Sequence, residues 1–389
     1  MKPKLYLHVG LPKAGSSTIQ KFLEENWEDF HRSGYLILNP KLMPYKGHGR
    51  PPGTIDYFKE LRDLAFQKAL IEDDKRYSYY QDLFRERFSN AAANGLDVIL
   101  SAENLTWLHP LTFKLLLSST ENFDLKVIIY LRRQDLWLES AWKQWFIQSD
   151  SGGFGAWLQE KVKKRYIGLL APFGLWAGVL DEKSIFANIL DKKFLKDGSL
   201  IEDFCGILGY DSQGKTVDSQ NEMIHRDMLT FLYRRNSDIY TEENVLDVHI
   251  LMRQIEEKVS LEGSPRIMSE EMRRSVLAAY KEDNIVLVEK YFSGRKEDAL
   301  KYFWLDGRLE GATPLSQFNW EEVSVSQTYT RNLEEVLQYL FKKEMTQRTV
   351  YKENAKTAPL SLFKRTFNKL KGAFNAIFGA SAYFAKIGH

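Results

Sequence analysis

The sequence predicts an α/β fold in which helices cover both faces of a central parallel β-sheet, in three layers. Three short, largely apolar segments, at residues 5–9, 98–100 and 127–131, have the length and composition of buried strands. The first and the third are each followed by apolar residues at helical spacing. Strands that alternate with helices in this way form parallel sheets, because parallel neighbours need a crossover connection.

Length and composition favour one large catalytic domain. The chain has 389 residues, of which 44% are hydrophobic, which is enough for a normal folded core. We expect an α/β domain over residues 1–345, with helical additions such as 242–259 and 269–292, and a separate tail over residues 346–389. Cys205 is the only cysteine, so no internal disulfide forms, and its apolar surroundings predict a buried thiol.

The segment 5–18 is the most informative part of the chain. It combines a strand, a tight loop bounded by Gly10 and Gly15 with Lys13 inside it, and the start of a helix. Such a unit directs backbone N–H groups and the positive end of a helix dipole at one spot, which suits phosphate. The spacing follows the Walker A pattern G-x-x-x-x-G-K-[ST], except that Ser16 stands at the lysine position. We therefore predict a P-loop NTPase-like fold with an unusually placed lysine.

A second element follows the apolar segment 127–131. Arg132 comes as this strand ends, and Ser140 lies eight residues later in a helical pattern. Ligands of open α/β sheets bind outside the carboxyl ends of the strands, and an arginine fork suits phosphate oxygens. The sequence therefore predicts that Arg132 lies where a ligand of the sheet would bind and can contact a phosphate.

These elements resemble those of sulfotransferases that use 3′-phosphoadenosine-5′-phosphosulfate (PAPS), in particular the bacterial carbohydrate-type group. Residues 12–18, P-K-A-G-S-S-T, resemble the 5′-phosphosulfate loop P-K-[TSA]-G-[TS]-[TS], and Arg132 with Ser140 resembles the 3′-phosphate element. Weaker similarities, such as Gly34-Tyr35 at a strand entry, extend to about residue 295. The resemblance implies PAPS as cofactor, 3′-phosphoadenosine-5′-phosphate as product and no metal. It assigns cofactor binding to Lys13, Ala14, Gly15, Ser16, Ser17, Thr18, Arg132 and Ser140.

The resemblance also implies the catalytic roles. Lys13 lies next to the bridging oxygen of PAPS and stabilises the leaving phosphate, while a base takes the proton of the attacking hydroxyl or amine. Glu103 follows the strand 98–100 and resembles the S-x-E element of the bacterial group, so it is our candidate base. A carboxylate that favours a helix N-terminus is the structural alternative for Glu103. His48 and His109 are weaker candidates for the base and for contacts with the acceptor.

The expected acceptor is a glycan or glycolipid, and we expect no nucleic-acid partner for a chain of net charge +2. Residues 355–389 carry six basic and no acidic residues, with apolar residues at helical spacing. Such a basic amphipathic helix either binds an anionic membrane or docks on the catalytic domain. No signal-peptide pattern or membrane-spanning run occurs, so we expect a cytoplasmic protein, peripheral on the inner membrane face.

Two alternatives of other classes share the same fold. A P-loop nucleotide kinase or ATPase needs a magnesium carboxylate and a better-placed lysine, and the strand that ends in Leu131-Arg132 carries no Walker B aspartate. A catalytically inactive, membrane-tethered scaffold needs none of Lys13, Arg132 and Ser140. The presence of all three disfavours the scaffold.

Overall fold

A computed structural model of the chain describes residues 2–39, 42, 74–108, 110–143, 153–217 and 267–304. The chain divides into two compact units, Met1–Glu322 and Val323–His389, and the described residues all belong to the first. The expected boundary between residues 345 and 346, the basic tail and the helical pattern at 242–259 lie outside the described residues.

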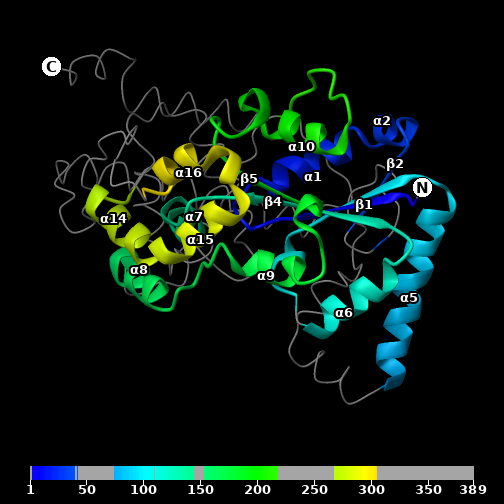
Figure 1. Ribbon diagram of the computed structural model, residues 1–389, viewed down its shortest axis with the longest axis horizontal. Coiled ribbons are helices and arrows are strands. Elements are labelled where there is room, and N and C mark those ends of the chain that lie inside the picture. Colours follow the sequence, from blue (N-terminus) through cyan, green and yellow to red (C-terminus); the bar gives the residue numbers. More distant parts are fainter. Residues whose placement is uncertain are drawn as a thin grey trace, which may run out of the picture. The chain divides into compact units, whose positions relative to one another are not determined.

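The core of the first unit is a five-stranded sheet with the order β2-β3-β1-β4-β5 (Figure 1). Its strands are β1 (Lys4–Val9), β2 (Tyr35–Leu38), β3 (Asp97–Ala102), β4 (Asp124–Leu131) and β5 (Ile185–Ile189). All neighbouring strands are parallel, and β1 in the centre pairs with β3 on one side and β4 on the other. The predicted α/β fold of the P-loop NTPase-like type is thereby confirmed.

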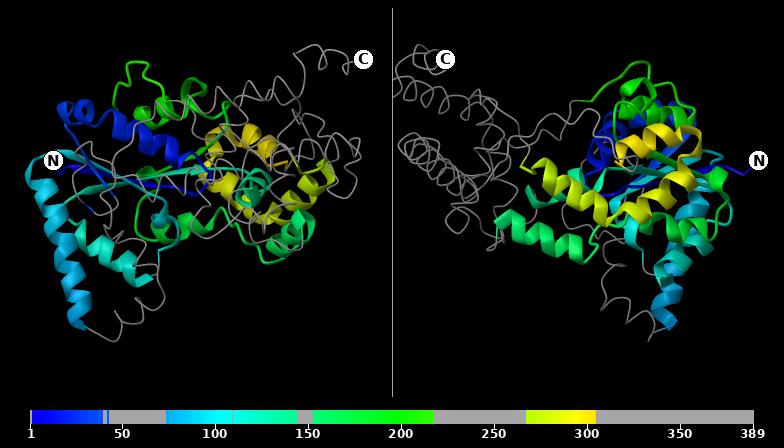
Figure 2. Two further views of the ribbon diagram at one scale, coloured as in Figure 1. Left: turned by 180° about the vertical axis from the view of Figure 1, so that it is seen from behind. Right: turned by 60° about the vertical axis from the view of Figure 1, so that its left-hand side comes forward.

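Helices cover both faces of the sheet (Figures 1 and 2). One face carries α1 (Ser16–Glu25), α2 (Trp27–Arg32) and α10 (Leu200–Leu208), and the other carries α5 (Asp74–Ala93), α6 (Pro110–Ser119) and α9 (Ala171–Ala177). The helix α1 illustrates the cause, because its residues Ile19, Phe22 and Leu23 recur at helical spacing and are all buried. Each such apolar stripe is removed from water only by packing on the sheet.

Further helices lie beyond the end of the sheet at which β4 and β5 are found (Figure 1). They are α7 (Gln134–Ala141), α8 (Gly153–Lys163), α14 (Glu270–Ala279), α15 (Lys281–Tyr291) and α16 (Lys296–Tyr302). Short 3₁₀ turns are η1 (Glu103–Trp107), η3 (Glu182–Ser184), η4 (Lys196–Gly198) and η5 (Ser293–Arg295). The expected helix at 269–292 is two helices, which meet at the buried Tyr280.

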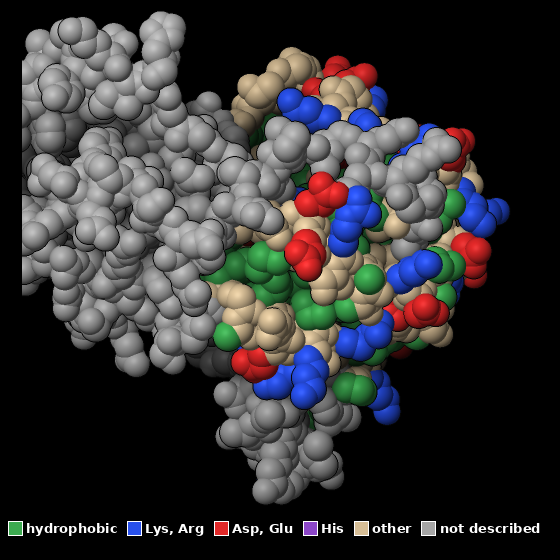
Figure 3. All heavy atoms as spheres, turned by 90° about the vertical axis from the view of Figure 1, so that its left-hand side faces the viewer, with side chains coloured by type: hydrophobic (Ala, Val, Ile, Leu, Met, Phe, Trp, Pro, Cys, Tyr) green, Lys and Arg blue, Asp and Glu red, His purple; other side chains and the backbone are tan. Residues whose placement is uncertain are grey.

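Cys205 is buried in α10, as its apolar neighbourhood predicts, and burial raises the pKa of its thiol to about 12. No helix in the described part of the chain is long and apolar enough to cross a membrane. Basic and acidic side chains are interspersed on the face drawn in Figure 3. Exposed side chains of opposite charge form ion pairs such as Lys164–Glu160 and Arg274–Glu270.

Candidate functional site

The loop between β1 and α1 is closed by a turn and by two residues with left-handed backbone conformations. The N–H of Ala14 donates to the carbonyl of Leu11 at 3.1 Å, and φ is 64° at Lys13 and 88° at Gly15. Glycine suits the last of these positions because L side chains rarely adopt its φ, and a Cβ there would also lie 2.5 Å from Cδ2 of Leu200. Packing from α10 therefore helps to shape the loop.

The first turn of α1 presents backbone N–H groups at the end of this loop. Gly15 is the N-cap and supplies no side-chain acceptor, and the first turn has no acidic residue. The N–H of Thr18 donates to the carbonyl of Gly15, whereas no described residue accepts from the N–H groups of Ser16 and Ser17. A helix N-terminus of this kind, at the end of a glycine-bounded loop, has the geometry of a phosphate-binding loop.

A small buried hydroxyl occupies the position where a Walker A loop has its lysine. The side chain of Ser16 is buried, and its Oγ donates to the carbonyl of Leu11 at 3.4 Å. A Cβ added to Gly10 would lie 2.4 Å from this Oγ, so the two ends of the loop are in close contact. The positive charge of the loop is instead supplied by Lys13, which is half-buried.

Arg132 directly follows β4 and reaches the loop. Its Nη1 donates to the carbonyl of Lys13 at 3.0 Å. Trp137, a buried residue of α7, donates from its indole Nε1 to the carbonyl of Pro12 at 2.6 Å. The side-by-side placement of β1 and β4 makes both contacts possible. Thus the loop after β1 and the segment that begins at Arg132 after β4 lie together at the carboxyl ends of these strands.

Ser140 lies on α7 and is half-buried. This helix begins at Gln134, two residues after Arg132, and Trp137 holds it against the loop. The structure therefore places Ser140 on the element that follows Arg132, as expected.

Glu103 begins the η1 turn directly after β3. Because Ala102 lies opposite Val9 in the parallel register, Glu103 is next to the start of the loop. A Cβ on Gly10 would lie 3.3 Å from Cγ of Glu103, and Thr106 of the same turn donates from its hydroxyl to the carbonyl of Gly10 at 2.6 Å. The half-buried Glu103 is thus both the first residue of a helical turn and a neighbour of the loop.

The candidate histidines His48 and His109 lie outside the described residues, whereas His8 is described. His8, on β1, is fully buried, and its Nδ1 lies 2.8 Å from the hydroxyl of Ser101 on β3. Burial lowers the pKa of His8 to about 3, so the ring is neutral and packs as part of the core.

Sequence reasoning missed a buried ion network on α7. The carboxylates of Asp135 and Glu139 are fully buried. Arg133 Nε lies 2.7 Å from Asp135 Oδ1, and Lys143 Nζ lies 2.8 Å from Glu139 Oε1. Arg273 of α14 contacts both acids, with Nη1 2.8 Å from Asp135 Oδ2 and Nη2 3.4 Å from Glu139 Oε2. The available signal was the pair of acids spaced i, i+4 within an apolar helical pattern.

Comparisons with known proteins assign no family. No family model matches the chain. It is 28% identical over 181 residues to an uncharacterized protein of Archaeoglobus fulgidus, across 45% of this chain and 48% of the other. The chain therefore spans about half the length of that curated relative.

Among solved structures, the chain is similar to one from a study of the PezAT chromosomal toxin–antitoxin system of Streptococcus pneumoniae. The alignment covers 66% of this chain and 85% of the other, at 14% identity and a TM-score of 0.21. This is a distant resemblance that assigns no function.

Within the described residues, no three His, Cys, Asp or Glu side chains gather as a metal site would require. The site comprises a P-loop-like loop, called the anion loop after its proposed ligand, a lysine within it, an arginine that contacts it and a carboxylate beside it.

Proposed function

We propose that this chain is a PAPS-dependent sulfotransferase. The observation that carries the proposal is the hydrogen bond from Arg132 Nη1 to the carbonyl of Lys13, at 3.0 Å, because it joins the strand-end arginine to the loop lysine. PAPS is an anion at both ends of its adenosine moiety, and so needs two such elements side by side. The loop and the N-terminus of α1 take the 5′-phosphosulfate, and Arg132 with Ser140 takes the 3′-phosphate.

In this proposal, the sulfuryl group moves in line to a hydroxyl or amine of the acceptor. The bond between sulfur and the bridging phosphate oxygen breaks while a bond from sulfur to the acceptor oxygen or nitrogen forms. Lys13 stabilises the negative charge that the departing 3′-phosphoadenosine-5′-phosphate gains, and Glu103 accepts the acceptor's proton. The placement of Glu103 against Gly10 supports this role. The proposed acceptor is a glycan or glycolipid, reached at the cytoplasmic face of a membrane.

A P-loop nucleotide kinase or ATPase is the second candidate, and one observation favours it. The strand β4 ends without a Walker B carboxylate, but β3 also flanks β1 and leads directly to Glu103. A carboxylate at that position suits Mg²⁺ bound to a nucleotide phosphate. In this alternative Glu103 is a metal ligand instead of a base. Ser16 at the lysine position weighs against it.

Ligand-dependent thermal stability distinguishes these candidates. A ligand that binds only the folded state raises the melting temperature. We expect a larger rise with 3′-phosphoadenosine-5′-phosphate than with ADP or with ATP and magnesium. A rise only with ATP and magnesium would favour the kinase, and no rise with any nucleotide would leave the inactive scaffold.

Amino-acid substitutions show which residues the rise in melting temperature depends on. Arg132→Ala should remove the advantage of 3′-phosphoadenosine-5′-phosphate over ADP, because only the former carries a 3′-phosphate. The matched control is Arg32→Ala, since Arg32 is exposed on α2 and pairs with Asp29. An unchanged advantage in Arg132→Ala would contradict the proposed 3′-phosphate contact.

A further inference from the structure

Among the described strands, β2 is at one edge of the sheet, and its outer backbone groups have no partner among the described residues. The parallel register places Leu36 opposite Val98, and the N–H of Asp97 donates to the carbonyl of Gly34 at 3.0 Å. In a parallel ladder, alternate residues direct both backbone groups to the same neighbour. This register turns the backbone groups of Tyr35 and Ile37 away from β3, and no described residue bonds to them there. Such an edge is a template for a further strand.

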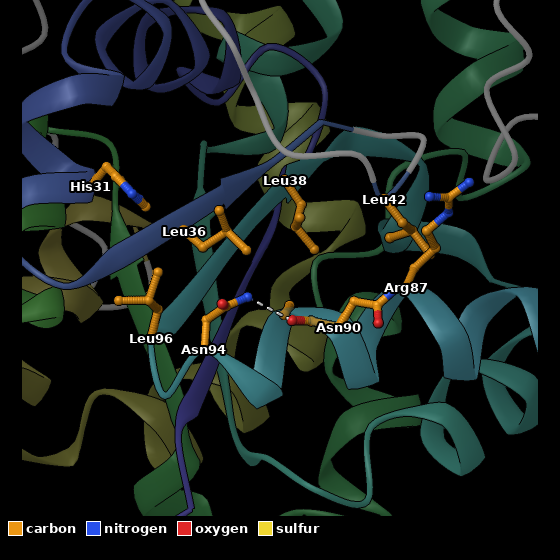
Figure 4. A pocket seen from close by; sticks show the side chains of 9 residues that line it. His31, Leu36, Leu38, Leu42, Arg87, Asn90, Asn94 and Leu96 are labelled. Atoms are coloured by element: carbon orange, nitrogen blue, oxygen red, sulfur yellow. Dashed lines mark hydrogen bonds between the residues drawn. The ribbon is translucent and has the colours of Figure 1, made fainter.

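A groove of about 490 Å³ lies beside this edge, between β2 and α5 (Figure 4). Apolar side chains form much of its lining, among them Leu36, Leu38 and Leu42; α5 adds Arg87 and Asn90, and Asn94 lies in the turn that follows this helix. Leu36 and Leu38 point into the groove together because alternate side chains of a strand share a face. A strand added to the edge would direct its own alternate side chains into the same space.

The described residues that line the groove include two basic side chains and no acidic one. Its basic residues are His31 at the end of α2 and Arg87 on α5. Arg87 is half-buried and makes no hydrogen bond or ion pair with a described residue. A guanidinium that has lost part of its hydration favours a carboxylate partner.

We propose that this groove binds an extended peptide segment of a partner protein as a sixth strand beside β2. The peptide's backbone bonds to Tyr35 and Ile37, its alternate apolar side chains enter the groove beside Leu36 and Leu38, and an acidic side chain pairs with Arg87. The helices α2 and α5 flank the edge, so a single segment fits better than a second sheet with its own flanking helices (Figure 1). This site lies at a different strand from the loop and is independent of the proposed sulfuryl transfer.

The first experiment tests the backbone pairing with the full chain. The probes are fluorescein-labelled hexapeptides in which leucine alternates with threonine ahead of an aspartate, and fluorescence anisotropy reports binding. N-methylation of the residues that face β2 should abolish binding, whereas N-methylation of the intervening residues should not. Equal effects of the two methylation patterns, or no binding at millimolar peptide, would overturn the proposal.

The second experiment tests the charge. Arg87→Gln should weaken peptide binding by roughly tenfold, as loss of a charge-assisted hydrogen bond does. Arg85→Gln, on an exposed position of the same helix, is the matched control and should bind like the parent chain. Melting temperatures without ligand show whether both variants are folded. Equal weakening by both variants, binding of decanoate in place of peptide, or a concentration-dependent dimer that Arg87→Gln abolishes would overturn the proposal.

Discussion

At the residue scale, the backbone conformation of Lys13 bears most directly on the proposed chemistry. Its left-handed backbone, at φ 64°, costs a non-glycine residue about 1 kcal/mol or more. The contact from Arg132 to its carbonyl, and the contact from Trp137 to the carbonyl of Pro12 before it, hold this conformation. The chain thus maintains an unfavourable backbone geometry at the one lysine of its anion loop.

We predict that Lys13→Ala lowers turnover by about 100-fold or more, because it removes a group that stabilises charge in the transition state. The measurement is release of 3′-phosphoadenosine-5′-phosphate from PAPS with a panel of saccharide acceptors. Lys21→Ala is the control, since Lys21 lies on α1 near Glu25 at 3.6 Å and away from the loop. Similar turnover in the two variants would refute the role of Lys13.

His8 predicts a dependence of stability on pH. Its pKa is about 3 in the folded chain and 6.5 ordinarily, so the unfolded chain binds its proton first as pH falls. The stability that the neutral ring contributes is complete above about pH 6.5 and is lost progressively toward pH 3. Between pH 6.5 and 5, His8 should account for about 2 kcal/mol of lost unfolding free energy.

Urea unfolding of the parent chain and of His8→Gln at several pH values measures this contribution. The difference between their pH slopes isolates His8 from the other titrating groups. Equal slopes would show that His8 does not titrate as proposed.

At the scale of elements, α7 links the anion loop to helices from a distant part of the sequence. Trp137 on one side of it donates to the loop, while Asp135 and Glu139 bind Arg273 of α14. Arg133, just before α7, donates from Nη1 to the carbonyl of Tyr302 on α16 at 2.9 Å. The position of Ser140 therefore depends on ion pairs with the second half of the chain.

We predict that Arg273→Met destabilises the fold by about 3–5 kcal/mol, because two buried carboxylates lose a shared cation. Arg274→Met is the matched control, since Arg274 pairs with Glu270 at the surface and should change stability by about 0.5 kcal/mol or less. Urea unfolding gives both values. Arg273→Lys keeps the charge and should recover part of the loss if the first variant fails to fold. Equal stabilities of the Met variants would show that the network is not stabilising.

At the scale of the whole molecule, the order β2-β3-β1-β4-β5 arranges the proposed roles along one edge of the sheet. The loop follows the central strand β1, Arg132 follows β4 on one side, and Glu103 follows β3 on the other. Parallel strands bring all three carboxyl ends to one edge, which is where ligands of such sheets bind. The groove beside β2 is at the outer side of the same sheet.

The tail gives a prediction for the whole chain. Deletion of residues 346–389 should abolish sedimentation with vesicles that contain phosphatidylserine, because basic residues and the apolar residues at helical spacing are removed together. Added salt should weaken binding of the parent chain. The thermal response to 3′-phosphoadenosine-5′-phosphate should be the same with and without the tail. Retained vesicle binding after deletion would exclude the tail as the membrane contact.

The sequence was sufficient for features that depend on local periodicity. The strands β1, β3 and β4 were predicted within a few residues, because central parallel strands read as short apolar runs. The glycines, Lys13 and the hydroxyl residues of the loop were recognisable because their spacing is itself the signal. The strand β5 was not predicted, since its five residues include the polar Asn188.

By itself, then, the sequence determined the α/β class and pointed to the loop and the residues that are proposed for cofactor binding and catalysis. Only the tertiary structure decided that β3 and β4 both flank β1, that Arg132 contacts the backbone of Lys13, and that Glu103 lies beside Gly10. It also decided the ion network that joins α7 to α14. The physical reason is that these contacts join residues far apart in the chain, and crossover topology, which no local pattern encodes, brings them together.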